Sequence, residues 1–152
     1  MDNFVKKKLI EYLKTFVTKK RLELLEEKLE LRTKKVTLVL EDIYQSRNIS
    51  AAMRSADCFG IQDVHVIENY NEFKPDREVA MGASNWLTVN RYEKNENNTL
   101  DCIQSLKNRG YRIVATSPHN SQTDLINFDL SKGKTALFFG TELEGLSNLV
   151  FE

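Results

Sequence analysis

The chain has 152 residues, of which 41% are hydrophobic and 29% are charged, and its 22 basic and 22 acidic residues cancel. This composition is typical of one globular domain and excludes collagen-like, mucin-like and wholly disordered proteins. Because the apolar runs are far shorter than the roughly 20 residues that cross a bilayer, and the lysine-rich start lacks a signal-peptide core, we expect a cytoplasmic protein without a membrane partner.

The charges are unevenly distributed along the chain. Residues 1–35 contain 11 Lys and Arg against 6 Asp and Glu, so this part carries +5 and the remainder −5. The basic positions come early, at Lys6, Lys7, Lys8, Lys14, Lys19, Lys20 and Arg21. Such a cluster attracts a phosphate backbone through counterion release, although a solvated helix face explains it more simply. Nucleic-acid binding becomes the better explanation only if the rest of the chain independently indicates it.

The first predicted elements are helical. Between residues 3 and 31 apolar side chains recur at three- and four-residue spacings, which predicts two short amphipathic helices with a break near Thr18. Residues 36–40 then form a continuous β-rich apolar run, which predicts a strand buried on both faces, as in a parallel sheet. We therefore expect a basic helical extension over residues 1–35 and a main domain over residues 36–152.

From this strand onward, strand-like and helix-like segments alternate. This pattern predicts an α/β fold with an open, mostly parallel sheet and helices on both faces. The basic residues before Gly110 fit the end of a helix, because they complement its dipole and the glycine fits its left-handed cap. The predicted order is a helix over 49–56, strands over 64–67 and 86–89, a helix over 100–106, and strands over 111–115 and 135–139.

Cysteine and histidine give no sign of a metal site. Cys58 and Cys102 lie far apart without a CxxC partner, which suits a reducing compartment, and we expect both to be small buried apolar residues. His65 and His119 belong to no HExxH motif and have no metal-ligand spacing. His65 alternates with apolar neighbours in a strand, so we expect it to pack in the sheet.

Ligands of open α/β sheets collect beyond the carboxyl ends of the strands, and three such ends are informative here. After the first strand, Asn48 lies at a helix start and Arg54 follows about 1.7 turns later. Taken alone, Asn48 fits an N-cap and Arg54 a surface residue. Residues 115–120 form a polar turn that an ordinary loop explains equally well. After the last strand, Gly140 and Gly145 bracket Glu142, which lets main chain approach a ligand closely.

Several common sites are absent from the sequence. There is no GxxxxGK[ST] phosphate loop and no GxGxxG fingerprint of a nicotinamide dehydrogenase. There is also no GxSxG elbow of a serine hydrolase. Acidic residues after the last strand favour a cationic ligand or a nucleotide without a triphosphate. The residues alone thus predict an α/β domain with a ligand site at its strand ends.

Two segments carry a family resemblance. Residues 48–60 and 138–147 resemble the first and second signature motifs of the SpoU family of RNA 2′-O-methyltransferases, and residues 81–86 and 115–119 are also similar to that family. The resemblance covers residues 36–152 and, more loosely, the first helices. It implies a SPOUT-type α/β fold whose carboxy-terminal segment threads into a trefoil knot. It also implies a homodimer with active sites near the subunit interface.

The resemblance further implies methyl transfer from S-adenosylmethionine to a ribose 2′-hydroxyl of tRNA, with the D-loop guanosine at position 18 as the favoured target. The alternative substrate is rRNA or another tRNA ribose. On this basis Arg54 matches the arginine implicated in activating the hydroxyl and is also a candidate RNA contact. Asn48 matches the asparagine that supports the site, and Glu142 matches the acidic residue of the second motif.

Other candidate residues follow from the same resemblance. The loops that surround the methyl donor in the family correspond to Thr116, Gly140, Thr141, Glu142 and Gly145. A tRNA substrate also makes the early lysines candidates for phosphate contacts, namely Lys6, Lys7, Lys8, Lys19 and Lys20.

One expected motif is missing. Family members carry a third motif, a Ser-Leu-Asn-Val-Ser-type stretch that supplies a catalytic serine and asparagine and completes the knot. The present sequence reaches Glu152, five residues after Ser147, without it. We therefore expect the methyltransferase domain to be incomplete at its carboxyl end, with the knot-forming segment absent. A catalytically silent module for RNA binding or dimerisation is the corresponding alternative function.

Overall fold

The computed structural model describes residues 2–118 and 124–152. The chain divides into two compact units, Met1–Arg32 and Thr33–Glu152. The second unit contains the sheet and both segments that resemble the family motifs.

The first unit is a pair of helices, α1 (Asn3–Lys14) and α2 (Lys19–Glu30). The break predicted near Thr18 is confirmed, since Thr18 is the N-cap of α2 and its hydroxyl oxygen accepts a hydrogen bond from the Arg21 N–H at 3.3 Å. No residue of these two described helices is buried. Neither they nor the other helices within the described ranges have the length and apolar character of a membrane span.

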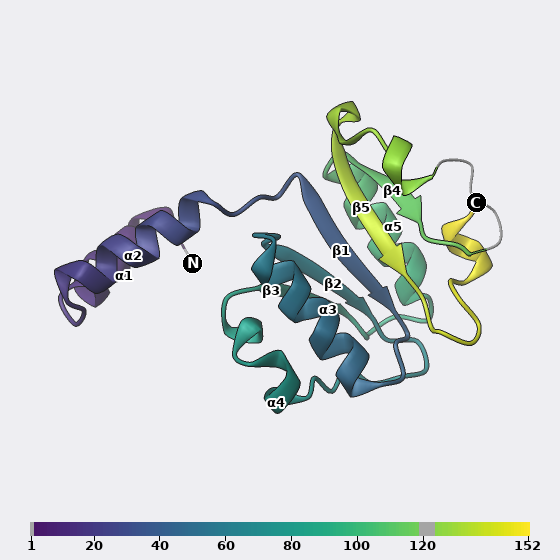
Figure 1. Ribbon diagram of the computed structural model, residues 1–152, viewed down its shortest axis with the longest axis horizontal. Helices are drawn as coiled ribbons and strands as arrows, with labels where there is room; N and C mark the ends of the chain where they lie inside the picture. Colours follow the sequence, from purple (N-terminus) through teal and green to yellow (C-terminus); the bar gives the residue numbers. More distant parts are fainter. Residues whose placement is uncertain (1, 119–123) are drawn as a thin grey trace. The chain divides into compact units, whose positions relative to one another are not determined.

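The second unit is built on a five-stranded sheet with the order β3-β2-β1-β5-β4 (Figure 1). All four strand pairings are parallel, so the predicted parallel α/β sheet is confirmed. The central position of β1 explains why its sequence is a continuous apolar run. The strand bounds are β1 Val36–Glu41, β2 Asp63–Ile67, β3 Thr88–Tyr92, β4 Tyr111–Ala115 and β5 Lys134–Phe139.

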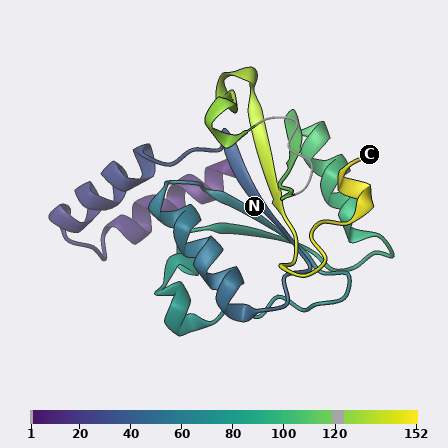
Figure 2. The same cartoon turned by 45° about the vertical axis from the view of Figure 1, so that its right-hand side comes forward.

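Two helices cover opposite faces of the sheet, as both views show (Figures 1 and 2). On one face α3 (Ser46–Cys58) packs Ile49 and Met53 against Leu38 and Leu40 of β1. On the other face α5 (Asn98–Asn108) packs against Val39 and other apolar residues. Alternate residues of β1 therefore enter two separate cores, and each core buries one side of the strand.

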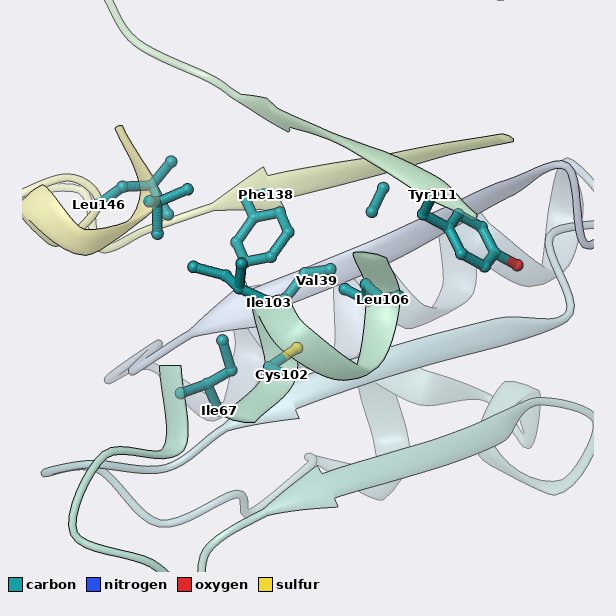
Figure 3. Close-up of a cluster of buried hydrophobic side chains, with 10 residues drawn as sticks. Val39, Ile67, Cys102, Ile103, Leu106, Tyr111, Phe138 and Leu146 are labelled. Carbon is teal, nitrogen blue, oxygen red and sulfur yellow. The ribbon is translucent and has the colours of Figure 1, made fainter. Parts of the chain in front are cut away.

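The core on the α5 face also includes residues from the segment that follows β5. Figure 3 shows Cys102, Ile103 and Leu106 of α5 gathered around Phe138, with Leu146 at one end of the cluster and Tyr111 at the other. The prediction that Cys102 is buried is confirmed, and this burial raises the pKa of its thiol to about 12.

The prediction for Cys58 is wrong, because this cysteine is exposed. It follows Arg54 by four residues and Arg47 by eleven, so helical periodicity places it on the solvent stripe of α3 rather than on the stripe of Ile49 and Met53.

Other differences from the predicted elements lie in short segments. The third strand begins at Thr88 rather than at residue 86, because the Trp86 N–H bonds to the Ala83 carbonyl at 3.0 Å and closes a turn. The helix predicted from residue 49 begins at Ser46. Five short elements were not predicted, namely α4 Arg77–Ala80, η1 Ala83–Asn85, η2 Leu125–Asn127, η3 Leu130–Lys132 and η4 Asn148–Val150.

Candidate functional site

The candidate site lies where the loops after β1 and β5 leave the middle of the sheet. The two strands are paired, with Leu40 beside Phe139 at their carboxyl ends. The later strands β2 and β3 lie on one side of β1, whereas β5 and β4 lie on the other. Loops that diverge at such a switch of strand order leave a crevice, which is where open α/β sheets bind ligands.

Asn48 and Glu142 meet in this crevice. The Asn48 side-chain Nδ2 donates a hydrogen bond to Glu142 Oε1 at 2.8 Å, although the residues are 94 positions apart. Asn48 is the third residue of α3, and Gln45 rather than Asn48 holds the N-cap position. The Asn48 amide is therefore directed toward the other loop, not toward its own helix end, and the two motif segments come together in space.

Glu142 is presented by a tight turn over residues 140–145. Thr141 and Gly145 exchange two backbone hydrogen bonds at 3.0 Å, and the Thr141 hydroxyl accepts a bond from the Glu144 N–H at 3.0 Å. A Cβ on Gly140 would lie 2.0 Å from the Gly145 carbonyl oxygen, so no larger residue fits. Gly145 has a φ of +74°, which favours glycine. Both glycines of the second motif are thus needed by the turn itself.

A cavity of about 730 Å³ opens beside this turn. Its polar lining residues include Asn48, Asn71, Thr141 and Glu142, and apolar side chains of β1, α3 and Phe139 also line it. Three exposed apolar side chains also border it, Tyr44 at 79%, Phe59 at 82% and Leu143 at 92% exposure. The cavity therefore combines a polar corner with a broad apolar wall.

Arg54 lies outside the cavity lining. It follows Asn48 by six residues, which is about 240° around the helix, and its side chain is exposed on the solvent stripe of α3. Ala51 and Ser55 of the same helix line the cavity, whereas Arg54 does not. Within residues 2–118 and 124–152 no ion pair involves Arg54. Its guanidinium is therefore open to a molecule that approaches α3 from solvent.

Five residues were predicted to contact the methyl donor. Gly140, Thr141 and Glu142 line the cavity, but Thr116 and Gly145 do not. The Thr116 hydroxyl donates to the Phe138 carbonyl at 2.8 Å, and the Thr116 N–H donates to the same oxygen at 3.1 Å. The side chain of Thr116 thus closes the ends of β4 and β5 together.

The predicted RNA-binding lysines all belong to the helical unit. Lys6, Lys7 and Lys8 lie in α1, and Lys8 Nζ is 4.5 Å from the centre of the Phe4 ring. Lys19 and Lys20 open α2, and Lys19 pairs with Glu23 at 3.8 Å. These contacts are confined to the exposed surface of the unit and leave the ammonium groups accessible to solvent.

The histidines form no metal site in the described part of the chain, where no group of three or more His, Cys, Asp or Glu is placed to hold an ion. His65 is fully buried in β2, as expected from its apolar neighbours. His119 lies outside the described residues.

Two functional candidates escaped the sequence interpretation, Glu41 and Asp42 at the end of β1. Their carboxylates accept hydrogen bonds from Ser147 and Asn69, respectively, and so reach the loops after β5 and β2. The available signal was a pair of acidic residues directly after a buried apolar strand, but their partners are distant in sequence.

Comparison with known proteins places these features in a family. Residues 35–152 match the model of the SpoU rRNA Methylase family. A tRNA (guanosine(18)-2′-O)-methyltransferase of Borreliella burgdorferi is 43% identical over 147 residues, which cover 97% of this chain and 65% of that enzyme.

Solved structures show the same fold. The TrmH/SpoU tRNA modifying enzyme of A. aeolicus superposes with a TM-score of 0.73 at 26% identity, over 87% of this chain and 65% of that one. The SpoU methyltransferase AviRb of Streptomyces viridochromogenes, solved with AdoMet, gives a TM-score of 0.64 at 22% identity, over 82% and 50%. The chain thus spans about two thirds, or less, of the length of these relatives.

Proposed function

This chain belongs to the SpoU rRNA Methylase family, and from that premise we propose that it carries out S-adenosylmethionine-dependent methylation of a ribose 2′-hydroxyl in tRNA, with the guanosine at position 18 as target. The name of the Borreliella relative states 2′-O-methylation of guanosine 18 in tRNA for that enzyme. The observation that carries the proposal is the hydrogen bond between Asn48 and Glu142, because it joins the two motif segments at one cavity.

The proposal includes the setting of the reaction. Residues 36–152 form the methyltransferase domain, and the enzyme works in the cytoplasm as a homodimer. The exposed apolar side chains around the cavity, Tyr44, Phe59 and Leu143, support association with a second subunit, because a soluble protein rarely leaves such a group uncovered.

The residues of the turn fit the proposed methyl donor. S-adenosylmethionine supplies a methyl group on a cationic sulfur and carries no phosphates, so the carboxylates of Glu142 and Glu144 suit its charge. A Cβ on Gly145 would meet nothing within 4 Å, which leaves main chain open to close approach. Gly140, Thr141, Glu142 and Gly145 are the residues that hold the donor in this proposal. Thr116 contributes by fixing the neighbouring strand end, since its hydroxyl is already bonded to Phe138.

The chain's part in the reaction is mainly to position the reacting groups. A ribose hydroxyl is a poor nucleophile at neutral pH, and good orientation of two reactants contributes roughly 7 to 11 kcal/mol. Arginine stays protonated in proteins, so Arg54 acts by donating hydrogen bonds to the developing oxyanion or an adjacent phosphate. Its exposed place on α3 suits this role, because the RNA approaches from solvent. Asn48 holds Glu142 and thereby the turn.

Transfer of a labelled methyl group from S-adenosylmethionine to tRNA transcripts tests the proposal. Arg54→Ala is expected to lower the rate of transfer by roughly 10²- to 10³-fold, the usual effect of removing one donor to an oxyanion, while donor affinity stays nearly unchanged. Arg47→Ala is the matched control, because Arg47 is exposed on the same stripe of α3. We expect this control to keep most of the activity.

Three results would contradict the proposal. Equal losses of methyl transfer and donor binding in Arg54→Ala would remove its assigned role. Transfer to a tRNA transcript whose position 18 carries a 2′-deoxyribose would exclude that nucleotide as the target, and transfer to rRNA fragments alone would replace the substrate class.

A further inference from the structure

Glu41, the last residue of β1, holds an unusual place beneath the candidate site. Its side chain is only 3% exposed, yet it is a carboxylate at the end of an apolar strand. Oε2 accepts a hydrogen bond from the Ser147 N–H at 2.8 Å, and Oε1 accepts bonds from the Ser147 hydroxyl at 2.8 Å and the Thr99 hydroxyl at 2.6 Å. One carboxylate therefore joins β1 to two segments that are distant in sequence.

The chemistry of this contact argues for a positioning role. Burial of a carboxylate is strongly unfavourable unless hydrogen bonds replace its hydration. All three donors to Glu41 are neutral, and no cation of the described ranges forms an ion pair with it. An apolar side chain would fill this strand end without the desolvation penalty, so the carboxylate is best explained by the segments that it holds.

Ser147 is the residue at which the turn after β5 returns to the sheet. The turn leaves the sheet at Phe139, which is paired with β1, and it returns through Leu146, which is buried in the α5-face core. Glu142 projects between these two anchors and accepts the bond from Asn48. Because Glu41 fixes the return anchor by two hydrogen bonds, it sets how far Glu142 stands from α3.

Asp42 extends the same arrangement to the loop after β2. Its Oδ1 accepts bonds from the backbone N–H groups of Asn69, Tyr70 and Asn71 at 2.7, 2.8 and 3.2 Å. Asn71 lines the cavity. Asn69 also donates from Nδ2 to Asp42 Oδ2 at 3.0 Å and to the Thr99 hydroxyl at 2.9 Å, so Asn69 and Thr99 link Asp42 to Glu41.

We infer that Glu41 is a positioning residue for methyl transfer, and that it acts by fixing Ser147 and therefore the turn that carries Glu142. Asp42 does the same for the loop that carries Asn71. This inference rests on the proposed function, because it assigns the turn a catalytic purpose. Neither acidic residue needs to touch the donor or the RNA.

The test compares variants at both ends of β1 in the full-length protein. Glu41→Leu removes all three acceptor contacts, whereas Glu41→Gln keeps one acceptor oxygen for the Ser147 N–H and an amide that can donate to the two hydroxyls. Thr37→Val is the matched control, because it removes a buried 2.6 Å hydrogen bond to the Asp63 carbonyl at the opposite end of the same strand. Ser147→Ala removes one hydrogen bond from the partner side.

We expect Glu41→Leu to lower kcat by about 10- to 100-fold with little change in KM for tRNA, because a misplacement of about 1 Å costs that much. The kcat values of Glu41→Gln and Ser147→Ala should lie between those of Glu41→Leu and the wild type. Thr37→Val should have the kcat of the wild type, even where it loses as much thermal stability as a Glu41 variant. Equal kcat values for the Glu41 variants and Thr37→Val would overturn the inference. If Glu41→Leu does not fold, the kcat values of Glu41→Gln and Ser147→Ala are compared with that of Thr37→Val instead.

Hydrogen exchange separates this inference from the proposed function. The Thr141 and Gly145 amides close the turn, so they should exchange faster in Glu41→Leu than in Thr37→Val. A wild-type protein without methyl transfer would end the proposed function but leave this comparison intact. Equal exchange rates of these amides in the two variants would show that Glu41 does not hold the turn.

Discussion

At the scale of single residues, Gly140 and Gly145 are both required by the turn after β5, but for different physical reasons. At Gly140 the obstacle is a neighbouring atom, since a Cβ would lie 2.0 Å from the Gly145 carbonyl oxygen. At Gly145 the surrounding space is open and the obstacle is the left-handed backbone, with a φ of +74°. The first constraint is a collision that only a backbone shift relieves, whereas the second is an intrinsic preference.

This difference predicts unequal losses of stability. Gly145→Ala should lower the free energy of unfolding by about 1 to 2 kcal/mol, the penalty of a left-handed non-glycine residue. Gly140→Ala should lower it by more than about 3 kcal/mol, because overpacking against main chain has no side chain to absorb it. Urea denaturation of both variants measures the two values, and a larger loss for Gly145→Ala would reverse our explanation.

The candidate site was only partly visible at this scale in the sequence. Asn48 and Glu142 could be selected because each sits in a recognisable motif, and the structure does bring them within 2.8 Å. Glu41 could not, because a charged residue that ends a strand usually marks the boundary with solvent. Its burial depends on Ser147, which is 106 residues away, and no local pattern reports such a contact.

At the scale of elements, periodicity predicted the long strands and helices well, and α3 and α5 each bury a regular stripe, although α1 and α2 bury no residue. It failed where structure depends on single tertiary contacts. The short helix α4 follows Asp76, whose N–H donates to the Ser50 hydroxyl of α3 at 2.7 Å and whose carboxylate caps the helix. The apolar residues from Trp86 onward likewise predicted a strand over residues 86–89, although Trp86 closes a turn.

The strand β2 also carries a buried titratable side chain, His65. Its Nδ1 lies 3.0 Å from the Tyr92 hydroxyl, and its Nε2 lies 3.5 Å from Arg109 Nη1. Burial, together with the positive charge of Arg109, lowers the pKa of His65 to about 4. The imidazole is therefore neutral in the folded protein at pH 7, and folding opposes its protonation.

The sign of the resulting pH dependence follows from this pKa. In the unfolded chain histidine titrates near 6.5, so the stability supported by neutral His65 is complete above that pH and is lost as pH falls from 6.5 toward 4. Protonation of His65 lowers the free energy of unfolding by at most about 3 kcal/mol. Urea denaturation at pH 7 and pH 4.5 measures it, and His65→Gln should show a smaller difference between the two values. The same difference in both proteins would exclude His65 as the cause.

At the scale of the whole molecule, the neutral total charge conceals a basic amino-terminal part. Residues 1–35 carry +5, and part of that charge is compensated within the helical unit. Lys14 lies 3.3 Å from Glu11 and 3.4 Å from Glu26, and these carboxylates raise the pKa of Lys14. Lys6, Lys7 and Lys20 form no ion pair with any described residue, so no salt bridge offsets their positive charges.

This charge distribution predicts the salt dependence of tRNA binding. Replacement of Lys6, Lys7, Lys8, Lys19 and Lys20 by Gln should weaken binding, and should make the plot of log affinity against log salt shallower by about one unit for each phosphate that no longer has a lysine partner. Lys14→Gln is the control, because two glutamates already offset that charge. Filter binding over a series of salt concentrations gives the slope. An unchanged slope in the fivefold variant would leave the two helices without a part in RNA binding.

The strand order determines when each strand of this sheet can pair during folding. β5 is the last of the described strands to be synthesised, yet it lies between β1 and β4, and β4 has no other partner among the described strands. While the ribosome still holds residues 134–139, β1 can pair only with β2 and β4 stays unpaired. Completion of the fold thus waits for closure of a very long loop, and refolding should be slow for a protein of this length.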